Sequence, residues 1–171
     1  RAAIGAFDAG TGNFLIHVGC QGLYSLQGRI ARSLGVDSDR IRVVSFDVGG
    51  GFGSRNVIYP EYLAVLWAAR EIGWAVKWTA RRDEEFYTTS QARDTILKGR
   101  LGLDRDGNFL GLRVDSICNL GAYHTGNGPF TQLRNLTRML AGTYRTPAIY
   151  LELTGVFTNK VPISSYRGVG R

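Results

Sequence analysis

Residues 41–53 of the chain read IRVVSFDVGGGFG, and Pro60 and Glu61 follow shortly afterwards. The apolar run Ile41–Phe46 predicts a short strand. Four glycines within Gly49–Gly53 predict a loop, because glycine adopts positive φ and lets a partner approach the main chain closely. A proline suits the first position of a helix and a glutamate suits the positive end of its dipole, so a helix is expected from Pro60. The stretch therefore predicts a strand, an open loop and a helix in succession.

Further elements flank this stretch on both sides. The turn chemistry of Asp104–Asn108 predicts a hairpin from Thr95 to Ser116. Other expected strands are Ala2–Asp8, Asn13–Val18, Ala75–Thr79 and Ile149–Phe157. Leu23, Leu26, Ile30 and Leu34 recur at helical spacing and predict a helix that stops at Gly35. The helix from Pro60 is expected to bury a stripe of Tyr62, Val65, Leu66, Ala69 and Ile72, and a further helix is expected over Leu133–Leu140. Hairpins mixed with crossover helices predict an α+β fold, a mixed sheet with covering helices, in a single domain over residues 1–171.

The chain is basic, with a formal net charge of +7 from 21 lysines and arginines against 14 acidic residues. A basic balance raises nucleic-acid binding as an interpretation. The charges are scattered, however, and the densest basic pair, Arg81-Arg82, is followed at once by Asp83-Glu84-Glu85. We therefore expect no nucleic-acid partner. The basic surface is then either simply solvated, or faces acidic partners or cofactor phosphates in a larger assembly.

Cysteine and histidine are scarce. Cys20 and Cys118 lie far apart in the sequence, no Cys-x-x-Cys occurs, and His17 and His124 are the two histidines. We expect no zinc site or iron–sulfur cluster held by this chain alone, and each cysteine is expected to fill core space. Free thiols favour a reducing compartment. No apolar run approaches the roughly 20 residues that cross a bilayer, so no membrane span is expected.

Three short stretches carry candidate binding groups. Asp47–Arg55 contains the glycine loop, whose successive N–H groups predict a concavity that binds an anion. It matches neither a Walker A loop nor the dinucleotide-binding glycine pattern, and a tight strand-to-helix turn is the alternative. Tyr166–Arg171 places two arginines beside two glycines, which suits an anion or an oxyanion; an exposed basic terminus is the alternative. Cys20-Gln21-Gly22 stands between a strand and a helix, where a glutamine is also an ordinary helix-entry residue.

Taken together, the three stretches resemble one family. Molybdenum hydroxylases include xanthine dehydrogenase, aldehyde oxidase and the large subunit of aerobic carbon monoxide dehydrogenase. Their cofactor subunit carries a glutamine segment, then a helix, a strand and Gly-Gly-Gly-Phe-Gly, and much later an aromatic-Arg-Gly loop. Here Gln21, Gly49–Gly53 and Tyr166-Arg167-Gly168 fall in that order at matching spacings. The resemblance covers essentially the whole chain and implies part of the molybdenum-cofactor-binding region of a larger subunit.

The resemblance also implies roles for individual residues. The Gln21 side chain is expected to hydrogen-bond an oxygen on molybdenum, and the two loops to approach the metal and the pterin. The cofactor-binding residues implied are Gln21, Gly50, Gly51, Phe52, Gly53, Arg167 and Gly168. Backbone N–H groups and a neutral amide stabilise the negative charge of such a centre without adding bulk. No residue is expected to ligate the metal directly, and the general-base glutamate is expected beyond Arg171.

The reaction implied by the resemblance is oxidative hydroxylation of a small-molecule substrate. The implied cofactor is molybdopterin with molybdenum, in its cytosine dinucleotide form, and electrons leave through 2Fe–2S and FAD groups on partner chains or domains. The piece in hand is expected to be inactive alone. We expect a cytoplasmic location, or a periplasmic one as in exported relatives. The alternative is a stand-alone cofactor-binding or scaffold module without catalysis.

Three positions depart from named members of the resembled family. Gly168 stands where copper-containing carbon monoxide dehydrogenases carry a cysteine, so copper ligation and carbon monoxide oxidation are not expected. Asn56 stands where xanthine dehydrogenases carry a purine-binding glutamate, and Val169 replaces a bulky aromatic residue near the purine. An aldehyde or an N-heterocycle is therefore the expected substrate. A piece of a larger subunit is also expected to expose apolar patches and to form a homodimer through them.

Overall fold

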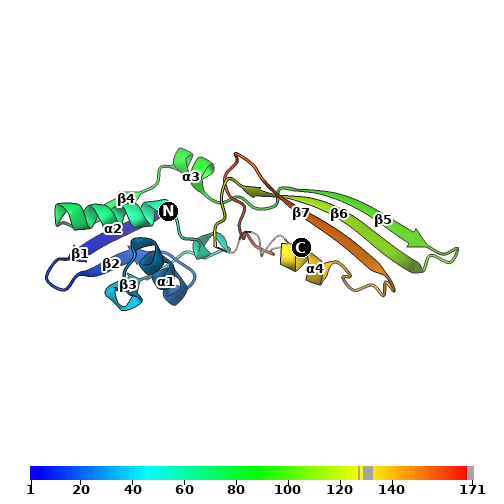
Figure 1. The fold of residues 1–171 in the computed structure, drawn as a ribbon, viewed down its shortest axis with the longest axis horizontal. Coiled ribbons are helices and arrows are strands. Elements are labelled where there is room, and N and C mark those ends of the chain that lie inside the picture. The colour runs from blue at the N-terminus through cyan, green and yellow to red at the C-terminus, as the bar shows by residue number, and fades with distance from the viewer. Residues whose placement is uncertain (127, 129–132, 169–171) are drawn as a thin grey trace. The chain divides into compact units, whose positions relative to one another are not determined.

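The computed structural model describes residues 1–126, 128 and 133–168 of the chain. Its contacts divide the chain into two compact units, residues 1–89 and 90–171, each with its own sheet (Figure 1). Both sheets mix parallel and antiparallel pairs, and helices accompany each. The predicted α+β fold, a mixed sheet with hairpins and covering helices, is confirmed. That the two units work as a single domain stays a prediction.

The first unit contains a four-stranded sheet in the order β3-β2-β1-β4. Its strands are β1 (Ala2–Asp8), β2 (Asn13–Val18), β3 (Ile41–Val44) and β4 (Val76–Thr79). β1 pairs antiparallel with β2 and with β4, whereas β2 and β3 run parallel. The first two strands have the predicted bounds, because their apolar alternation matches one buried face of the sheet. β3 ends two residues before the predicted Phe46.

Two helices, α1 (Leu23–Leu34) and α2 (Pro60–Ile72), cover that buried face. Both end at a glycine in the left-handed conformation, as predicted: Gly35 has φ 68° and Gly73 has φ 72°. The predicted buried stripe of α2 is wrong at Ile72, which is 59% exposed. Ile72 is the last residue of its helix, where fewer neighbours cover a side chain. The remaining stripe residues of α2 are buried: Tyr62, Val65, Leu66 and Ala69.

α2 approaches the sheet backbone to backbone at Gly5 of β1. A Cβ atom built on Gly5 would lie 2.9 Å from the carbonyl carbon and oxygen of Val65, closer than real Cβ contacts. Helix backbone does not move aside as a flexible side chain does. Glycine at this position therefore sets the distance between α2 and the sheet.

A third helix, α3 (Arg82–Thr88), closes the first unit and was not expected from the sequence. The Glu84 carboxylate accepts a hydrogen bond from the Arg81 N–H at 2.8 Å, which caps the helix start. The Arg1 guanidinium lies over the Tyr59 ring, 3.8 Å from its centroid. It also donates to Glu61 at 2.9 Å and to Glu85 at 3.1 Å. Arg1 therefore ties β1 to the starts of α2 and α3.

The second unit is a three-stranded sheet in the order β5-β6-β7. Its elements are β5 (Thr95–Leu103), β6 (Phe109–Gly121), α4 (Asn135–Met139) and β7 (Ile149–Phe157). β5 and β6 form the predicted hairpin, and β7 pairs parallel with β6. Asp104 holds the hairpin turn, because its carboxylate accepts from the Asn108 N–H at 2.8 Å and from the Asp106 N–H at 2.9 Å. The predicted helix over residues 133–140 is found as a π-helical turn at Leu133 and Arg134 followed by α4, which ends at Met139.

Large apolar side chains are exposed on the strands of the second unit, and the predicted apolar patches stay a prediction. They include Ile96, Leu97, Leu101, Leu103, Leu110, Ile117, Tyr150 and Phe157. A homodimer formed through them stays a prediction. Within the described ranges, no helix combines the length and the apolar character that crossing a bilayer requires.

Candidate functional site

Gln21 and the glycine loop follow the carboxyl ends of two neighbouring parallel strands. β2 ends at Val18, shortly before Gln21, and the paired strand β3 ends at Val44, shortly before Gly49–Gly53. Residues beyond the carboxyl ends of parallel strands meet at one edge of a sheet, where ligands commonly bind in α/β folds. The topology therefore brings two of the three candidate stretches together in the first unit.

Gln21 is bonded directly to that loop. Its side-chain Oε1 accepts a hydrogen bond from the Gly53 N–H at 2.8 Å, and its backbone N–H donates to the Arg55 carbonyl at 3.1 Å. A glutamine amide has one oxygen and one nitrogen, whose assignment follows the hydrogen-bond network. With the oxygen on Gly53, the Nε2–H groups face no acceptor among the described residues, and the residue is exposed. Gln21 thus presents donors suited to a ligand oxygen.

The loop has room for this glutamine only because residue 51 is glycine. A Cβ atom on Gly51 would lie 2.1 Å from both Cγ and Cδ of Gln21. Left-handed backbone surrounds this position: Gly50 has φ 98°, Phe52 φ 53° and Gly53 φ 88°. Such a φ is uncommon for a phenylalanine and clusters at functional sites. The sequence pattern predicted that the glycines let another group approach the main chain closely. In the structure, the group that approaches Gly51 is the Gln21 side chain.

The third stretch, Tyr166-Arg167-Gly168, lies in the second unit. Arg167 and Gly168 both have φ 42°, so the chain makes a left-handed turn through two successive residues. The carbonyls of all three residues accept hydrogen bonds from the Arg93 guanidinium. Val169, Gly170 and Arg171 lie outside the described residues. Convergence of Gln21, Phe52 and Arg167 on one site stays a prediction, since Arg167 belongs to the other unit.

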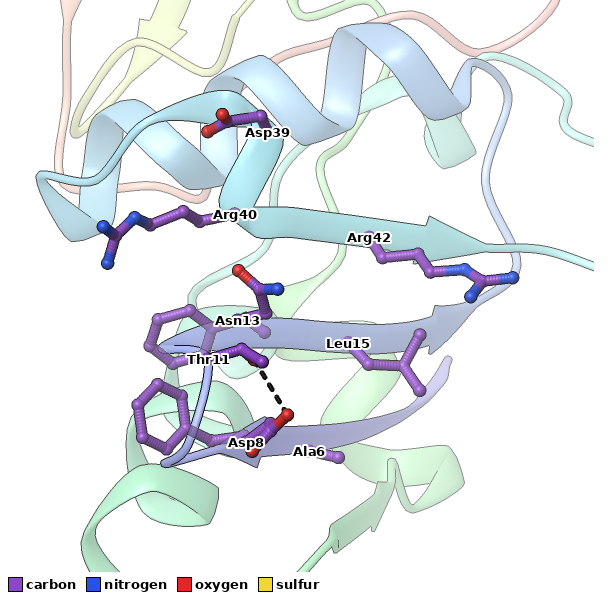
Figure 2. Close-up of a pocket in the computed structure, with 10 residues that line it drawn as sticks. Ala6, Asp8, Thr11, Asn13, Leu15, Asp39, Arg40 and Arg42 are labelled. Carbon is purple, nitrogen blue, oxygen red and sulfur yellow. Dashed lines mark hydrogen bonds between the residues drawn. The ribbon is translucent and has the colours of Figure 1, made fainter.

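A separate open pocket of about 450 Å³ lies at the other end of the first sheet (Figure 2). Its polar lining residues come from β1, β2, the turn between them and residues 39–42: Asp8, Thr11, Asn13, Asp39, Arg40 and Arg42. Its apolar lining residues are Ala6, Phe7, Phe14 and Leu15. The Asp8 carboxylate is already used, because it accepts from the Thr11 hydroxyl at 2.8 Å and from the Gly10 N–H at 2.9 Å. These bonds hold the pKa of Asp8 below its usual value. The pocket contains none of the predicted site residues.

The cysteines and the acidic groups do not form a metal site in the described part of the chain. No cluster of three or more histidine, cysteine, aspartate or glutamate side chains occurs there. Cys20 and Cys118 are free and buried, which confirms the prediction that they fill the core. Burial raises the pKa of the Cys20 thiol, although this residue immediately precedes Gln21. Its buried position in the core of the first unit fits a space-filling role.

Asp94 anchors the segment that carries Arg93. Its carboxylate accepts from Lys160 Nζ at 2.9 Å and from the Asn119 amide at 2.8 Å, and these bonds lower its pKa. A lowered folded-state pKa means that the stabilisation is complete above the ordinary carboxyl pKa of about 3.9 and is lost as pH falls through the folded-state value. The free energy of unfolding should therefore be lower for Asp94→Asn than for wild type near pH 7, and this difference should shrink in acid. A difference that stays constant down to about pH 2 would contradict this.

The whole chain matches one known family of domains. The model for the molybdopterin cofactor-binding domain aligns with residues 1–171. The chain belongs to the molybdopterin cofactor-binding family. Carbon monoxide dehydrogenase and a probable hypoxanthine oxidase are among the proteins that match the chain. The predicted resemblance to the molybdenum hydroxylases is therefore confirmed.

Two curated relatives and one solved structure illustrate the match. The chain is 37% identical over 143 residues to the 6-hydroxypseudooxynicotine dehydrogenase complex subunit gamma of Paenarthrobacter nicotinovorans, covering 83% of the chain and 18% of the relative. It is 33% identical over 159 residues to the carbon monoxide dehydrogenase large chain of Hydrogenophaga pseudoflava, covering 93% and 20%. Quinoline 2-oxidoreductase from Pseudomonas putida 86 matches with a TM-score of 0.93 and 34% identity, over 99% of this molybdopterin cofactor-binding chain and 22% of that one. The chain thus spans about a fifth of the length of these relatives.

Proposed function

We propose that the chain holds a molybdopterin cofactor as part of a larger oxidoreductase subunit that hydroxylates an aldehyde or an N-heterocycle. The observation that carries this proposal is the contact between Gln21 and the glycine loop: Oε1 accepts from Gly53 N–H at 2.8 Å, and any Cβ on Gly51 would overlap the glutamine. A bare backbone beside a neutral amide donor fits a bulky anionic cofactor, because such groups stabilise charge and leave space. The cofactor-binding residues proposed are Gln21, Gly50, Gly51, Phe52, Gly53, Arg167 and Gly168.

The bound cofactor would supply the two-electron chemistry of substrate oxidation, and the residues of this chain would bind and orient it. Gln21 holds its amide plane on Gly53 and offers N–H donors to an oxygen of the cofactor. The glycine loop supports the cofactor from the same edge of the sheet. Residues beyond this chain supply the general base. The chain alone is therefore proposed to be inactive.

Two of the relatives and the glycine at position 168 support the proposed substrate class. A glycine has no side chain that could ligate copper, which speaks against the chemistry of a copper–molybdenum carbon monoxide dehydrogenase. Nicotine 6-hydroxylase and quinoline 2-oxidoreductase, which match at 32% and 34% identity, are named for N-heterocycles. We also propose the cytosine dinucleotide form of the cofactor, 2Fe–2S and FAD groups on partner chains, and a cytoplasmic location. No nucleic-acid partner is proposed.

The deciding experiment is metal analysis by mass spectrometry, with pterin extraction, on the full-length subunit purified with its partner chains. Stoichiometric molybdenum with a pterin is the expected result, and turnover of aldehydes and N-heterocycles is then screened. Gln21→Ala should lower turnover by roughly tenfold or more, since a positioned donor to the reacting centre is lost. Fully matured protein without molybdenum or pterin would instead support a scaffold module that keeps the fold without the chemistry.

A further inference from the structure

One arginine gathers the backbone of the loop that contains Arg167. Arg93 Nη1 donates to the Tyr166 carbonyl at 3.0 Å, and Nη2 donates to the Arg167 and Gly168 carbonyls, each at 2.8 Å. The guanidinium is planar, always charged and carries its donors in a fixed fork. Three successive carbonyls can meet at one such fork only if the chain turns sharply around it. The bond pattern therefore fixes the loop conformation.

Without these bonds, the residues of the loop would seldom adopt this conformation. Arg167 has φ 42°, in the left-handed region that a residue with a side chain seldom occupies. Residues of this kind persist when their surroundings hold them, and they cluster at functional sites. Gly168 shares the same φ. The bonds from Arg93 compensate for the unfavourable backbone at Arg167.

Arg93 is itself held firmly, so it can act as a fixed support. Its neighbour Asp94 bonds through its carboxylate to Asn119 and Lys160, and its carbonyl accepts from the Asn119 N–H at 2.9 Å. On the other side, Gln91 N–H donates to the Pro162 carbonyl at 3.0 Å, and the Gln91 carbonyl accepts from Ser164 N–H at 2.8 Å. The root of the loop is buried at Ile163 and Ser164, each 3% exposed. The loop is therefore anchored at its buried base, and only its exposed tip extends beyond these contacts.

The positive charge of Arg93 would matter where the loop faces an anionic cofactor. A carbonyl oxygen carries partial negative charge, and three of them directed at an anionic cofactor would repel it. Bonded to Arg93, the three oxygens are neutralised by a cation. What the loop can then offer a ligand is the Arg167 side chain and glycine backbone, which suit an anion.

We propose that Arg93 is a positioning residue, which fixes the backbone of Tyr166–Gly168 so that Arg167 and Gly168 can face the cofactor. It acts through the loop and does not touch the cofactor itself. This inference rests on the proposed function, because that function places the loop at the cofactor. Nothing in the sequence around residue 93 marks the role, since the bonded carbonyls lie 73 to 75 residues further along the chain.

The test uses the full-length subunit assembled with its partner chains, as wild type, Arg93→Ala, Arg93→Lys and Arg100→Ala. Arg100 is an exposed arginine on β5 of the same unit and serves as the matched control. Hydrogen–deuterium exchange in peptides covering residues 164–168 should speed up roughly tenfold or more in Arg93→Ala, because charge-assisted bonds are lost. Arg93→Lys keeps the charge but not the fork and should fall between, while Arg100→Ala should match wild type.

Turnover and spectroscopy then separate positioning from mere stability. With molybdenum content unchanged, Arg93→Ala should lower kcat roughly 10- to 100-fold and alter the Mo(V) electron paramagnetic resonance spectrum, since small misplacement at a reacting centre costs rates of this order. Arg93→Lys should restore part of both. Faster exchange with an unchanged spectrum and unchanged kcat would overturn the positioning role alone. Wild-type enzyme without molybdenum would overturn the proposed function, and the cofactor role of the loop with it.

Discussion

Gly51→Ala in the full-length enzyme is expected to remove most of the bound molybdenum cofactor and to lower turnover at least about 100-fold. The added methyl group would lie 2.1 Å from Cγ and Cδ of Gln21, far inside van der Waals contact. Gln21 would have to swing away, which breaks its 2.8 Å bond to Gly53 and removes its amide from the edge of the sheet. A displacement of about 1 Å at a reacting centre lowers the reaction rate by about this factor.

The matched control for this substitution is Gly28→Ala. Gly28 lies inside α1 of the same unit, and a Cβ there would meet no atom within 4 Å. Alanine in a helix interior is favoured over glycine by about 1 kcal/mol, so this variant should be slightly more stable and fully active. Metal content by mass spectrometry and turnover report both variants. Normal values for Gly51→Ala would show that Gln21 relocates without consequence, and that its contact with the loop is not required.

Gly121→Ala should destabilise the second unit by about 3 kcal/mol or more. Gly121 ends β6 with φ 78°, a conformation that L side chains rarely adopt. A Cβ atom there would lie 2.4 Å from Cα of Pro162 and 2.7 Å from the Val161 carbonyl oxygen. Both atoms belong to backbone, so relief requires the chain itself to move. Because Pro162 belongs to the root of the Arg167 loop, the loop should loosen as well.

Hydrogen exchange of β6 and β7 amides is the suitable measurement, because a chain with two units need not unfold in one step. Gly99→Ala provides the control in the same sheet. Gly99 lies on β5 without a positive φ, and its Cβ would meet nothing within 4 Å. This substitution should leave protection unchanged or slightly raised. Equal protection in the Gly121→Ala and Gly99→Ala proteins would refute the steric argument.

The elements that could be predicted from sequence are those whose pattern is local. β1, β2, α1 and α2 follow from apolar alternation or helical spacing with glycine stops, and their bounds agree with the structure. α3 could not be found this way, because its residues Arg82–Thr88 are mostly polar and show no apolar stripe. Its position depends on Arg1, which bonds Glu85 from 84 residues away. Contacts of that separation leave no periodic trace in a sequence.

The candidate site also combines features that are visible in the sequence with contacts that only the structure reveals. The glycine loop and its order relative to Gln21 and Arg167 are visible in the sequence, and their role at a cofactor stays a prediction. The bond between Gln21 and Gly53 depends on β2 and β3 being parallel neighbours, which the residue pattern alone did not specify. Arg93 was missed altogether, since a single arginine before a strand has no distinctive signature. Its role appears only once the distant carbonyls are placed around it.

Each compact unit is continuous in the chain, which has a consequence for synthesis on the ribosome. Residues 1–89 hold every partner of the Gln21 loop described above, so this loop can fold as soon as the first unit emerges. Residues 90–171 follow roughly 4 to 16 s later at translation rates of about 5–20 residues per second. In the second unit, Arg93 emerges long before the carbonyls it binds. We expect the nascent chain to form the Gln21 loop and the Arg167 loop, the two parts of the proposed cofactor site, in a fixed temporal order.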